Sequence, residues 1–296
     1  MFRTTQLLKF PFIILGVTLI LGGDLGALDT FGAQEKVIYG EDRRIDVEDH
    51  PDSFLRELAR SSAAKISNIR LQKIDEDFYQ VRGRTLAEQG VCSDERFSDQ
   101  LASASCSGFL IGPDLLVTAA HCISHESDCL THKWVFDFKA SNSPHVDDFK
   151  ISSEHVFRCT EIVERKYQHR PYIDYAVIRL DRPVEGREFL ELRRQGEPSQ
   201  SVELAMLGHP SGLPLKITDG GRIRRIEATT LLVSIDAFAG NSGSAVVDAQ
   251  TGLVEGILVR GEEDYVWDNV NNCRRPKRCR ESGCRGEDVV RITEIN

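Results

Sequence analysis

The chain has 296 residues, with 37 Lys and Arg against 46 Asp and Glu, which gives a formal net charge of −9. Hydrophobic residues make up 41% and charged residues 28%, a globular composition that excludes a wholly disordered chain. The acidic balance is unfavourable for nucleic-acid binding, and we expect no nucleic-acid partner. The eight cysteines, an even number, indicate an oxidising compartment.

The N-terminus has the pattern of a secretory signal peptide. Arg3 and Lys9 make it positive, and an uncharged apolar run of 14 residues, 10–23, follows. About 20 apolar residues are needed to span a bilayer core, so an uncleaved anchor is the weaker alternative. We expect residues 1–27 to be removed, with cleavage after Ala33 as the other possibility. The remainder is then secreted or periplasmic, without stable membrane association.

The elements after this segment are one short helix and many short strands. The helix is expected at 54–61, with Asp52 or Ser53 as its N-cap. Turn clusters are expected at 112–114, 219–221 and 250–252. The expected strands are residues 63–71, 109–111, 115–119, 134–138, 156–163, 175–180, 202–207, 230–235, 245–248, 253–260 and 289–292. The runs 245–248 and 253–260 flank the turn AQTG and are predicted to form a hairpin. This pattern predicts an all-β chain, a sandwich or a barrel.

Three motifs contain the residue types of nucleophilic catalysis. His121 ends a strand-like run in TAAHC, Asp174 opens an apolar strand in DYAVI, and Ser242 lies in the turn GNSGS. A serine hydroxyl needs an adjacent base, histidine can accept and return its proton, and a buried carboxylate orients the histidine ring. The chain order His, Asp, Ser is that of the chymotrypsin-type triad. We predict these three as catalytic residues, and the backbone N–H groups of Gly240 and Ser242 as the oxyanion hole.

The same segments resemble those of trypsin-like serine proteases. CSGFLIGPDLLVTAAHC, DYAVIRL and GNSGSAV are similar to the histidine, aspartate and serine segments of that family. GNSGSAV, together with VIYGEDRR at 37–44, is similar to the bacterial glutamyl-endopeptidase-like branch. The resemblance runs from Val37 to at least Gly261. It implies two six-stranded antiparallel β-barrels with the active site between them. We expect one protease domain over 37–296, with its barrels meeting near 185–200.

The resemblance also implies a disulfide between Cys106 and Cys122, which flank the histidine segment. The other cysteines, at 92, 129, 159, 273, 279 and 284, allow 15 pairings, and the sequence does not choose among them. Their spacing lacks paired CxxC units, so we expect no metal site and no cofactor.

Two alternatives for substrate specificity follow from the resemblance. Asp236 lies six residues before the predicted nucleophile, where trypsin has the aspartate at the base of its pocket. A buried carboxylate there favours Arg or Lys. Glutamyl endopeptidases use a histidine in the strand before the pocket wall, and this chain has Leu258 there. We favour cleavage after Arg or Lys, with Val259, Arg260 and Gly261 bordering the substrate.

Activation is expected to differ from that of digestive trypsins. Asn241 stands where those enzymes have an aspartate that pairs with a new N-terminal ammonium, and a neutral amide cannot form that ion pair. Lys36 immediately precedes the segment that resembles a mature N-terminus. We therefore predict a second cut between Lys36 and Val37, which makes residues 28–36 a short propeptide.

Together these features predict a secreted, monomeric serine endopeptidase that hydrolyses protein or peptide substrates through an acyl-enzyme. A non-catalytic binding module on the same fold is an alternative, but such proteins usually lack a triad residue or the oxyanion glycine, which this chain retains. An esterase is a further alternative. Its usual elbow is G-x-S-x-G, whereas residues 240–244 end in serine, and the triad order differs.

Overall fold

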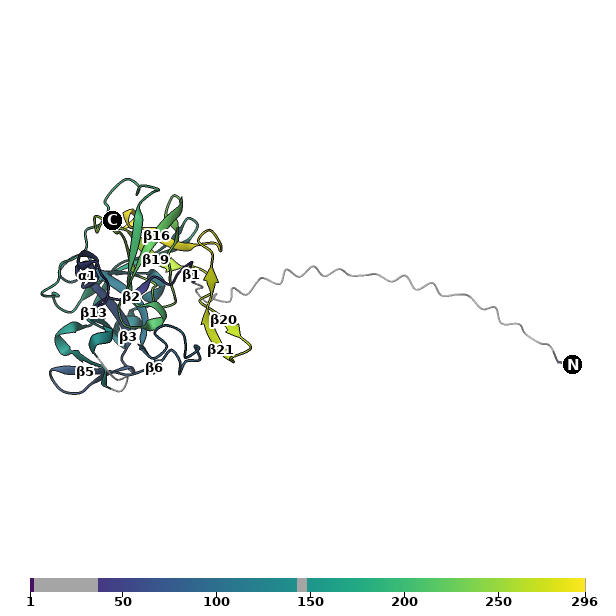
Figure 1. Ribbon diagram of the computed structural model, residues 1–296, viewed down its shortest axis with the longest axis horizontal. Coiled ribbons are helices and arrows are strands. Elements are labelled where there is room, and N and C mark those ends of the chain that lie inside the picture. Colours follow the sequence, from purple (N-terminus) through teal and green to yellow (C-terminus); the bar gives the residue numbers. More distant parts are fainter. Residues whose placement is uncertain (3–36, 143–147, 296) are drawn as a thin grey trace. The chain divides into compact units, whose positions relative to one another are not determined.

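The computed structural model describes residues 1–2, 37–142 and 148–295 (Figure 1). The expected propeptide and all but the first two residues of the expected signal peptide lie outside these ranges. Within them, no helix has both the length and the apolar character needed to cross a membrane. Two large antiparallel sheets make up most of the described chain, as the strand pattern predicts.

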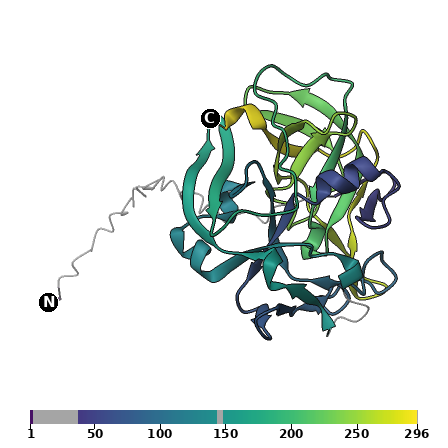
Figure 2. The same cartoon turned by 90° about the vertical axis from the view of Figure 1, so that its left-hand side faces the viewer.

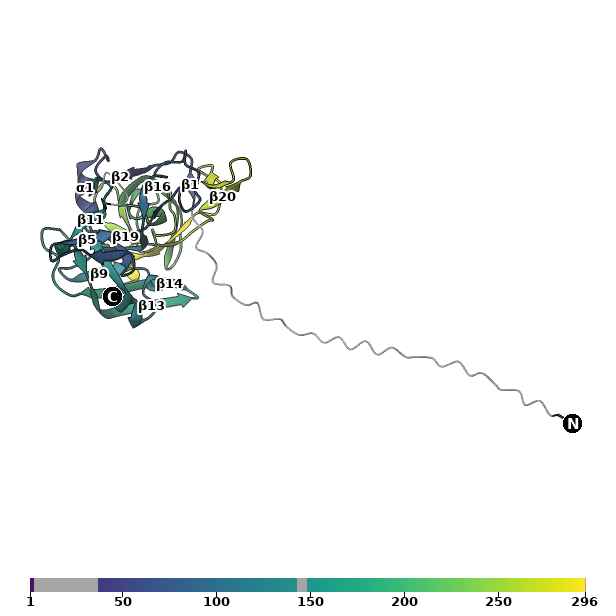
Figure 3. The same cartoon turned by 90° about the horizontal axis from the view of Figure 1, so that it is seen from below.

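The first of these, the N-terminal sheet, has seven strands. In spatial order they are β12 (Val156–Phe157), β10 (His132–Phe136), β3 (Ser62–Ser67), β8 (Ala104–Leu110), β9 (Leu115–Thr118), β14 (Tyr172–Leu180) and β13 (Cys159–His169). The long pair β13 and β14 lies side by side and is prominent in Figures 2 and 3. Apolar side chains on this sheet form two buried clusters.

The N-terminal sheet is a half-barrel rather than the closed barrel that the resemblance implies. Its two edge strands, β12 and β13, follow one another with only Arg158 between them. The backbone N–H of Arg158 donates to Asp181 Oδ1 at 3.0 Å, and its carbonyl accepts the Asp181 N–H at 2.9 Å. The two edge strands are therefore joined by a one-residue corner at Arg158, and Asp181, in the loop after β14, binds the backbone of that corner.

The second sheet closes into the C-terminal barrel. Its order is β15 (Glu203–Gly208), β18 (Ala245–Asp248), β19 (Val254–Arg260), β23 (Glu287–Arg291), β17 (Thr230–Ser234) and β16 (Lys216–Ile226). Pairing of β15 with β16 completes the six-stranded barrel, and β2 (Arg44–Asp46) pairs with residues 216–218 of β16. The predicted hairpin is confirmed as β18 and β19. The two sheets together confirm the predicted all-β, chymotrypsin-like architecture.

The predicted turn at 219–221 is wrong, because these residues lie inside β16. The pairing of β16 with β15 shifts register between Leu204 and Met206, and Gly220 has φ +70°. A bulge thus accommodates the Asp-Gly-Gly sequence without ending the strand. Pairing with three neighbouring strands outweighs the local turn signal.

The smaller elements surround the two sheets. The predicted helix is confirmed as α1 (Ser53–Ala59), and Asp52 caps it by accepting the Phe54 N–H at 2.8 Å. A small three-stranded sheet contains β4 (Leu71–Lys73), β5 (Phe78–Val81) and β11 (Lys150–Ser152). The two-stranded sheets are β6 (Arg84–Thr85) with β7 (Leu101–Ala102), β1 (Ile38–Tyr39) with β22 (Arg278–Cys279), and β20 (Tyr265–Asp268) with β21 (Cys273–Pro276). The other helical turns are α2 (Glu126–Thr131), η1 (Ala120–Cys122), η2 (Ala140–Asn142), η4 (Ser153–His155), η5 (Pro210–Gly212) and η6 (Ile292–Glu294).

An apolar core joins the N-terminal sheet to the C-terminal barrel. Phe109 and Tyr175 of the sheet belong to the same buried cluster as Ile217 and Ile257 of the barrel. The last strand of the sheet, β14, ends at Leu180, and the first strand of the closed barrel begins at Glu203. The three motifs identified in the sequence lie along this junction.

Candidate active site

His121 lies in the tight 3-10 turn η1 (Ala120–Cys122), directly after β9. Arg165 of the long β13 strand holds this turn from outside. Its Nε donates to the Ala120 carbonyl at 3.1 Å and to the Ile123 carbonyl at 2.6 Å. The Ala120 carbonyl also accepts the Ile123 N–H at 3.2 Å within the turn, whereas carbonyl groups at the very end of a helical turn lack a partner inside it. The backbone that carries the imidazole is thereby fixed.

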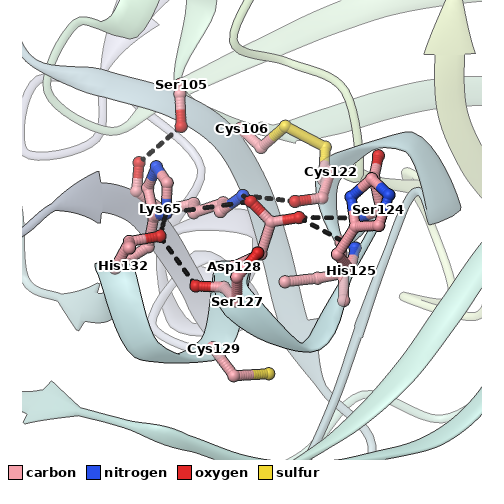
Figure 4. A network of polar contacts seen from close by, with 12 residues as sticks. Lys65, Ser105, Cys106, Cys122, Ser124, His125, Ser127, Asp128, Cys129 and His132 are labelled. Atoms are coloured by element: carbon pink, nitrogen blue, oxygen red, sulfur yellow. Dashed lines mark hydrogen bonds and ion pairs between the residues drawn. A yellow bond between two sulfur atoms is a disulfide. The ribbon is translucent and has the colours of Figure 1, made fainter.

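A second anchor of this turn is the buried Lys65 of β3 (Figure 4). Its Nζ donates to the Cys122 carbonyl and lies 3.3 Å from Asp128 Oδ1. Asp128 Oδ2 accepts the backbone N–H groups of Ser124 at 2.8 Å and His125 at 3.1 Å. Burial lowers the pKa of Lys65, and the negative charge of Asp128 opposes that shift. The pair ties β3 to the segment after η1.

Asp174 is fully buried in β14, and its two oxygens accept three hydrogen bonds. Oδ1 accepts the backbone N–H of His121 at 3.0 Å, and Oδ2 accepts His121 Nδ1–H at 2.6 Å and the Tyr172 hydroxyl at 3.0 Å. These donors compensate the desolvation of the buried carboxylate. Because Nδ1 carries the proton that is donated, Nε2 keeps a lone pair and can act as a base.

Tyr172 connects this carboxylate to a predicted substrate-binding residue. Burial, followed by the nearby charge of Asp174, raises the pKa of Tyr172, so its hydroxyl stays protonated and donates. The Arg260 guanidinium lies 3.8 Å from the centroid of the Tyr172 ring, and Arg260 Nε donates to Asp288 Oδ2 at 2.5 Å. Arg260 therefore lies beside the Asp174 network and is fixed by an ion pair.

Ser242 lies in the glycine-rich loop before β18. Its carbonyl oxygen accepts the Ser107 N–H at 2.8 Å and is 3.6 Å from Cys122 Sγ, next to the histidine. The buried Ser107 Oγ donates to the Gly240 carbonyl at 2.8 Å and accepts the His209 N–H at 3.0 Å. One serine of the N-terminal sheet thus holds the loop of the C-terminal barrel at two positions.

Two glycines give this loop its course. Gly240 has φ +95°, and a Cβ there would lie 2.5 Å from the His209 carbonyl oxygen. Gly243 has φ +90°, and a Cβ there would lie 2.1 Å from the Ser107 carbonyl oxygen. Any other residue would combine a strained backbone with a clash against the main chain. The path of the loop past Ser242 therefore requires glycine at both positions.

His121 follows a strand of the N-terminal sheet, and Ser242 precedes a strand of the C-terminal barrel. Within the described residues, His121 Nε2 is buried and has no hydrogen-bond partner. Ser242 Oγ lies 3.4 Å from the Val259 carbonyl oxygen.

Asp236 holds the N-terminal segment against the loop that leads to Ser242. Its Oδ1 accepts the Tyr39 N–H at 2.6 Å and its Oδ2 accepts the Arg43 N–H at 2.8 Å. The next residue, Ala237, donates its N–H to the Val37 carbonyl at 3.1 Å. Burial raises the pKa of Asp236 to about 6. Both carboxylate oxygens thus bind backbone, and a role at the base of a substrate pocket stays a prediction.

The other predicted substrate-binding residues, Val259 and Gly261, lie at the C-terminal end of β19 and just beyond it. Val259 is fully buried, and Gly261 lies against the side chain of Glu287. A Cβ on Gly261 would lie 1.5 Å from Glu287 Oε2. Glu287 is itself fully buried, and its Oε1 accepts the Tyr39 hydroxyl at 3.0 Å. A second buried carboxylate therefore lies beside the predicted substrate-binding strand.

All eight cysteines are paired. The structure joins Cys106 to Cys122 beside the histidine. The other pairs are Cys92–Cys273, Cys129–Cys159 and Cys279–Cys284. Four disulfides fit an extracellular or periplasmic protein.

Two groups of side chains within the described ranges have the composition of a metal site. They are Cys106 with His121 and Cys122, and Cys92 with Asp268 and Cys273. In each group the two sulfurs are bonded to one another, so neither offers a thiolate. Each group is therefore a disulfide beside one polar side chain, His121 in the first and Asp268 in the second.

Comparison with known proteins identifies the family. The trypsin-like peptidase domain matches residues 106–257, which include all three motifs. The chain belongs to the trypsin-like peptidase family. No curated protein sequence matches it.

Two solved structures with a similar fold are proteases whose sequence identity to this chain is low. The Rv3671c protease of M. tuberculosis H37Rv, in an inactive form, shares 13% identity with a TM-score of 0.48, over 88% of this chain and 93% of that one. A Glu endopeptidase shares 17% identity with a TM-score of 0.45, over 87% of this chain and 94% of that one. The assignment of the fold rests on the sheets of this chain and on its family.

Several residues of the site are absent from the sequence prediction. Tyr172 could have been found, since it lies two residues before Asp174 and so on the same face of the strand. Ser107 and Glu287 have no such local signal. They reach the site through contacts with segments more than 100 residues away.

Proposed function

We propose that this peptidase is a secreted serine endopeptidase in which Ser242 is the nucleophile, His121 the general base and Asp174 the residue that orients the histidine. The observation that supports this most strongly is the 2.6 Å hydrogen bond from His121 Nδ1 to the buried Asp174, at the junction where Ser242 lies. The backbone N–H groups of Gly240 and Ser242 are the proposed oxyanion hole.

In the proposed reaction, the Ser242 oxygen attacks the scissile carbonyl while its proton moves to His121 Nε2. The carbonyl π electrons move to the oxygen, which receives hydrogen bonds from the two loop N–H groups. Asp174 stabilises the imidazolium and remains a carboxylate. Collapse of the intermediate breaks the C–N bond, and His121 gives its proton to the leaving amine. Water then hydrolyses the acyl-enzyme through the same two steps, with His121 again as base.

For specificity we propose cleavage after Arg or Lys. Two buried carboxylates near the predicted pocket favour a cationic side chain: Asp236 before the nucleophile loop, and Glu287 against Gly261. Tyr39 contacts both, because its N–H donates to Asp236 and its hydroxyl to Glu287. A basic side chain sheltered from water between such groups would be bound far better than an apolar one.

The proposal is tested with the mature protein, a peptide library and a fluorophosphonate that labels activated serines. We expect the wild type to be labelled and to cleave peptides, and Ser242→Ala to lose labelling and several orders of magnitude in turnover while it keeps its fold. The matched control is the exposed Ser199→Ala, which should behave as wild type. Peptide binding without labelling or cleavage would establish a binding module instead, and cleavage confined to Glu would establish glutamyl specificity.

A further inference from the structure

We infer that Asp264, in the segment before the β20–β21 hairpin, is a positioning residue that holds the oxyanion-hole loop in its catalytic course. The inference rests on the proposed function, since it concerns the N–H of Gly240. Asp264 Oδ2 accepts the backbone N–H of Ala239, the residue before Gly240, at 2.9 Å. This hydrogen bond fixes the peptide unit between Phe238 and Ala239. The next peptide unit, between Ala239 and Gly240, carries the Gly240 N–H, and its orientation is restricted as a result.

The hairpin side of this contact is itself fixed. The carbonyl of Asp264 accepts the Lys277 N–H at 2.8 Å, which holds its backbone. Tyr265, the next residue, packs its ring 5.5 Å from that of Phe238 in the loop. The Tyr265 hydroxyl forms a 2.6 Å hydrogen bond with the hydroxyl of Ser211. Two successive residues, Asp264 and Tyr265, thus contact two successive residues of the loop.

A cavity shows that these contacts lie beside the oxyanion glycine. Its volume is about 290 Å³, and its lining includes Gly240 and Ala239 from the loop together with Asp264 and Tyr265. The Ala239–Asp264 contact is therefore part of the wall next to the proposed oxyanion hole rather than a remote loop contact.

A disulfide and an ion-pair cluster fasten the hairpin to the other half of the molecule. Cys273 of β21 is bonded to Cys92, which is 181 residues earlier in the chain. Arg275, also in β21, pairs with Asp94 at 3.0 Å and Glu95 at 2.6 Å, next to Cys92. The β20–β21 pair and the side on which it projects are visible in Figure 1. The hairpin therefore cannot move away from the Cys92 segment without breaking a covalent link or these ion pairs.

Support from outside this loop matters because the residue that carries the proposed oxyanion N–H is a glycine. Gly240 is conformationally permissive, and Asn241 is a neutral amide that cannot form an ion pair with an ammonium group. The hydrogen bond from Ala239 to a carboxylate is charge-assisted and so stronger than one to a neutral acceptor. Asp264 thus supplies a fixed anionic contact one residue before the oxyanion donor.

The test compares Asp264→Ala, Asp264→Asn and the matched control Glu263→Ala, which removes the same charge from the exposed neighbouring residue. Loss of an oxyanion donor costs about 10²–10³ in kcat, so loss of a contact that positions the donor should cost about tenfold to thirtyfold. We expect Asp264→Ala to lower kcat by that factor with KM changed less than twofold. Asp264→Asn should recover most of kcat because its amide oxygen still accepts the Ala239 N–H. Glu263→Ala should match wild type.

A second readout separates positioning from a general structural role. A peptide aldehyde forms a tetrahedral adduct that carries an oxyanion, whereas the corresponding peptide alcohol binds without one. We expect Asp264→Ala to weaken binding of the aldehyde by the same factor by which kcat falls, and to leave binding of the alcohol unchanged. Equal weakening of both inhibitors, or a kcat equal to that of Glu263→Ala, would overturn the inference.

The tether is tested with Cys92→Ser/Cys273→Ser, alone and combined with Asp264→Ala. If the disulfide acts through Asp264, the double-cysteine variant should lose kcat by a similar factor and the combination should lose little more. Losses that simply multiply would show that the disulfide does not act through this residue. Failure of the proposed function itself would appear separately, as a wild-type protein that the fluorophosphonate does not label.

Discussion

Ser107→Ala is the substitution outside the proposed triad with the most direct structural consequence. Ser107 is fully buried, and its hydroxyl donates to the Gly240 carbonyl at 2.8 Å and accepts the His209 N–H at 3.0 Å. Alanine would leave one buried C=O and one buried N–H without that partner. Each such group costs about 1–3 kcal/mol, so the free energy of unfolding should fall by about 2–4 kcal/mol after partial relaxation.

The same change should lower activity, because the Gly240 carbonyl loses the contact that holds it toward the N-terminal sheet. We expect a larger effect on kcat than on KM, since the oxyanion N–H groups act mainly in the transition state. Unfolding should be measured in urea on the Ser242→Ala background, which prevents self-digestion. Kinetics should be measured on the otherwise wild-type chain.

Ser103→Ala is the matched control. Ser103 is also buried, but its hydroxyl donates to the Arg82 carbonyl at 2.8 Å, and within the described ranges this hydroxyl forms no hydrogen bond with the loop that contains Ser242. We expect it to lose about 1–2 kcal/mol of stability and to keep its kcat. Equal loss of kcat in both variants, or an unchanged free energy of unfolding for Ser107→Ala, would refute the reasoning.

Three further predictions concern stability, specificity and maturation. Burial lowers the pKa of His209 to about 3 from its ordinary 6.5, so between these values only the unfolded chain binds the proton. Stability should therefore fall as pH decreases through this window, by about 1.4 kcal/mol per unit from this residue, and urea unfolding from pH 7 to 4 should show a shallower slope for His209→Asn. An unchanged slope would contradict this. For specificity, Asp236→Ser and the companion Glu287→Gln should each lower kcat/KM for Arg substrates far more than for Leu substrates, and equal losses on both would count against a charged pocket. N-terminal sequencing of secreted protein should find Val37 first in the wild type and a longer form in Ser242→Ala if the enzyme cuts itself after Lys36; fully active protein that starts earlier would rule out the propeptide.

Local signals in the sequence predicted the elements whose causes are themselves local. The capped helix α1 depends on Asp52 and its own first turn, and the β18–β19 hairpin depends on a five-residue connection. The strand β16 could not be predicted, because its Asp-Gly-Gly bulge imitates a turn and only pairing with distant strands keeps it extended. The half-barrel was equally hidden, since the pairing of its seven strands depends on segments that are far apart in the sequence.

The candidate site divides in the same way. His121, Asp174 and Ser242 are recognisable because the proposed chemistry requires particular side chains in particular local settings. The structure brings His121 and Asp174 into contact and lays the Ser242 main chain beside Cys122. Asp236 has the spacing expected of a pocket aspartate, but spacing carries no information about what its oxygens bind. They accept backbone N–H groups from the N-terminal segment.

The residues that support the nucleophile loop differ in kind from those that are proposed to react. Ser107 and Asp264 act on the loop through its backbone carbonyl and N–H groups, which every residue possesses. Any hydroxyl or carboxylate that lies close enough can form hydrogen bonds with those backbone groups. The sequence of the loop therefore does not specify which residue supports it. The sequence separation of 133 between Ser107 and Gly240, and the disulfide that joins β21 to Cys92, show how far away in the chain the supporting groups can lie. The proposed oxyanion hole, which is made of backbone, therefore takes its shape from tertiary contacts, and a substitution at such a contact should alter turnover although it touches neither substrate nor the proposed triad.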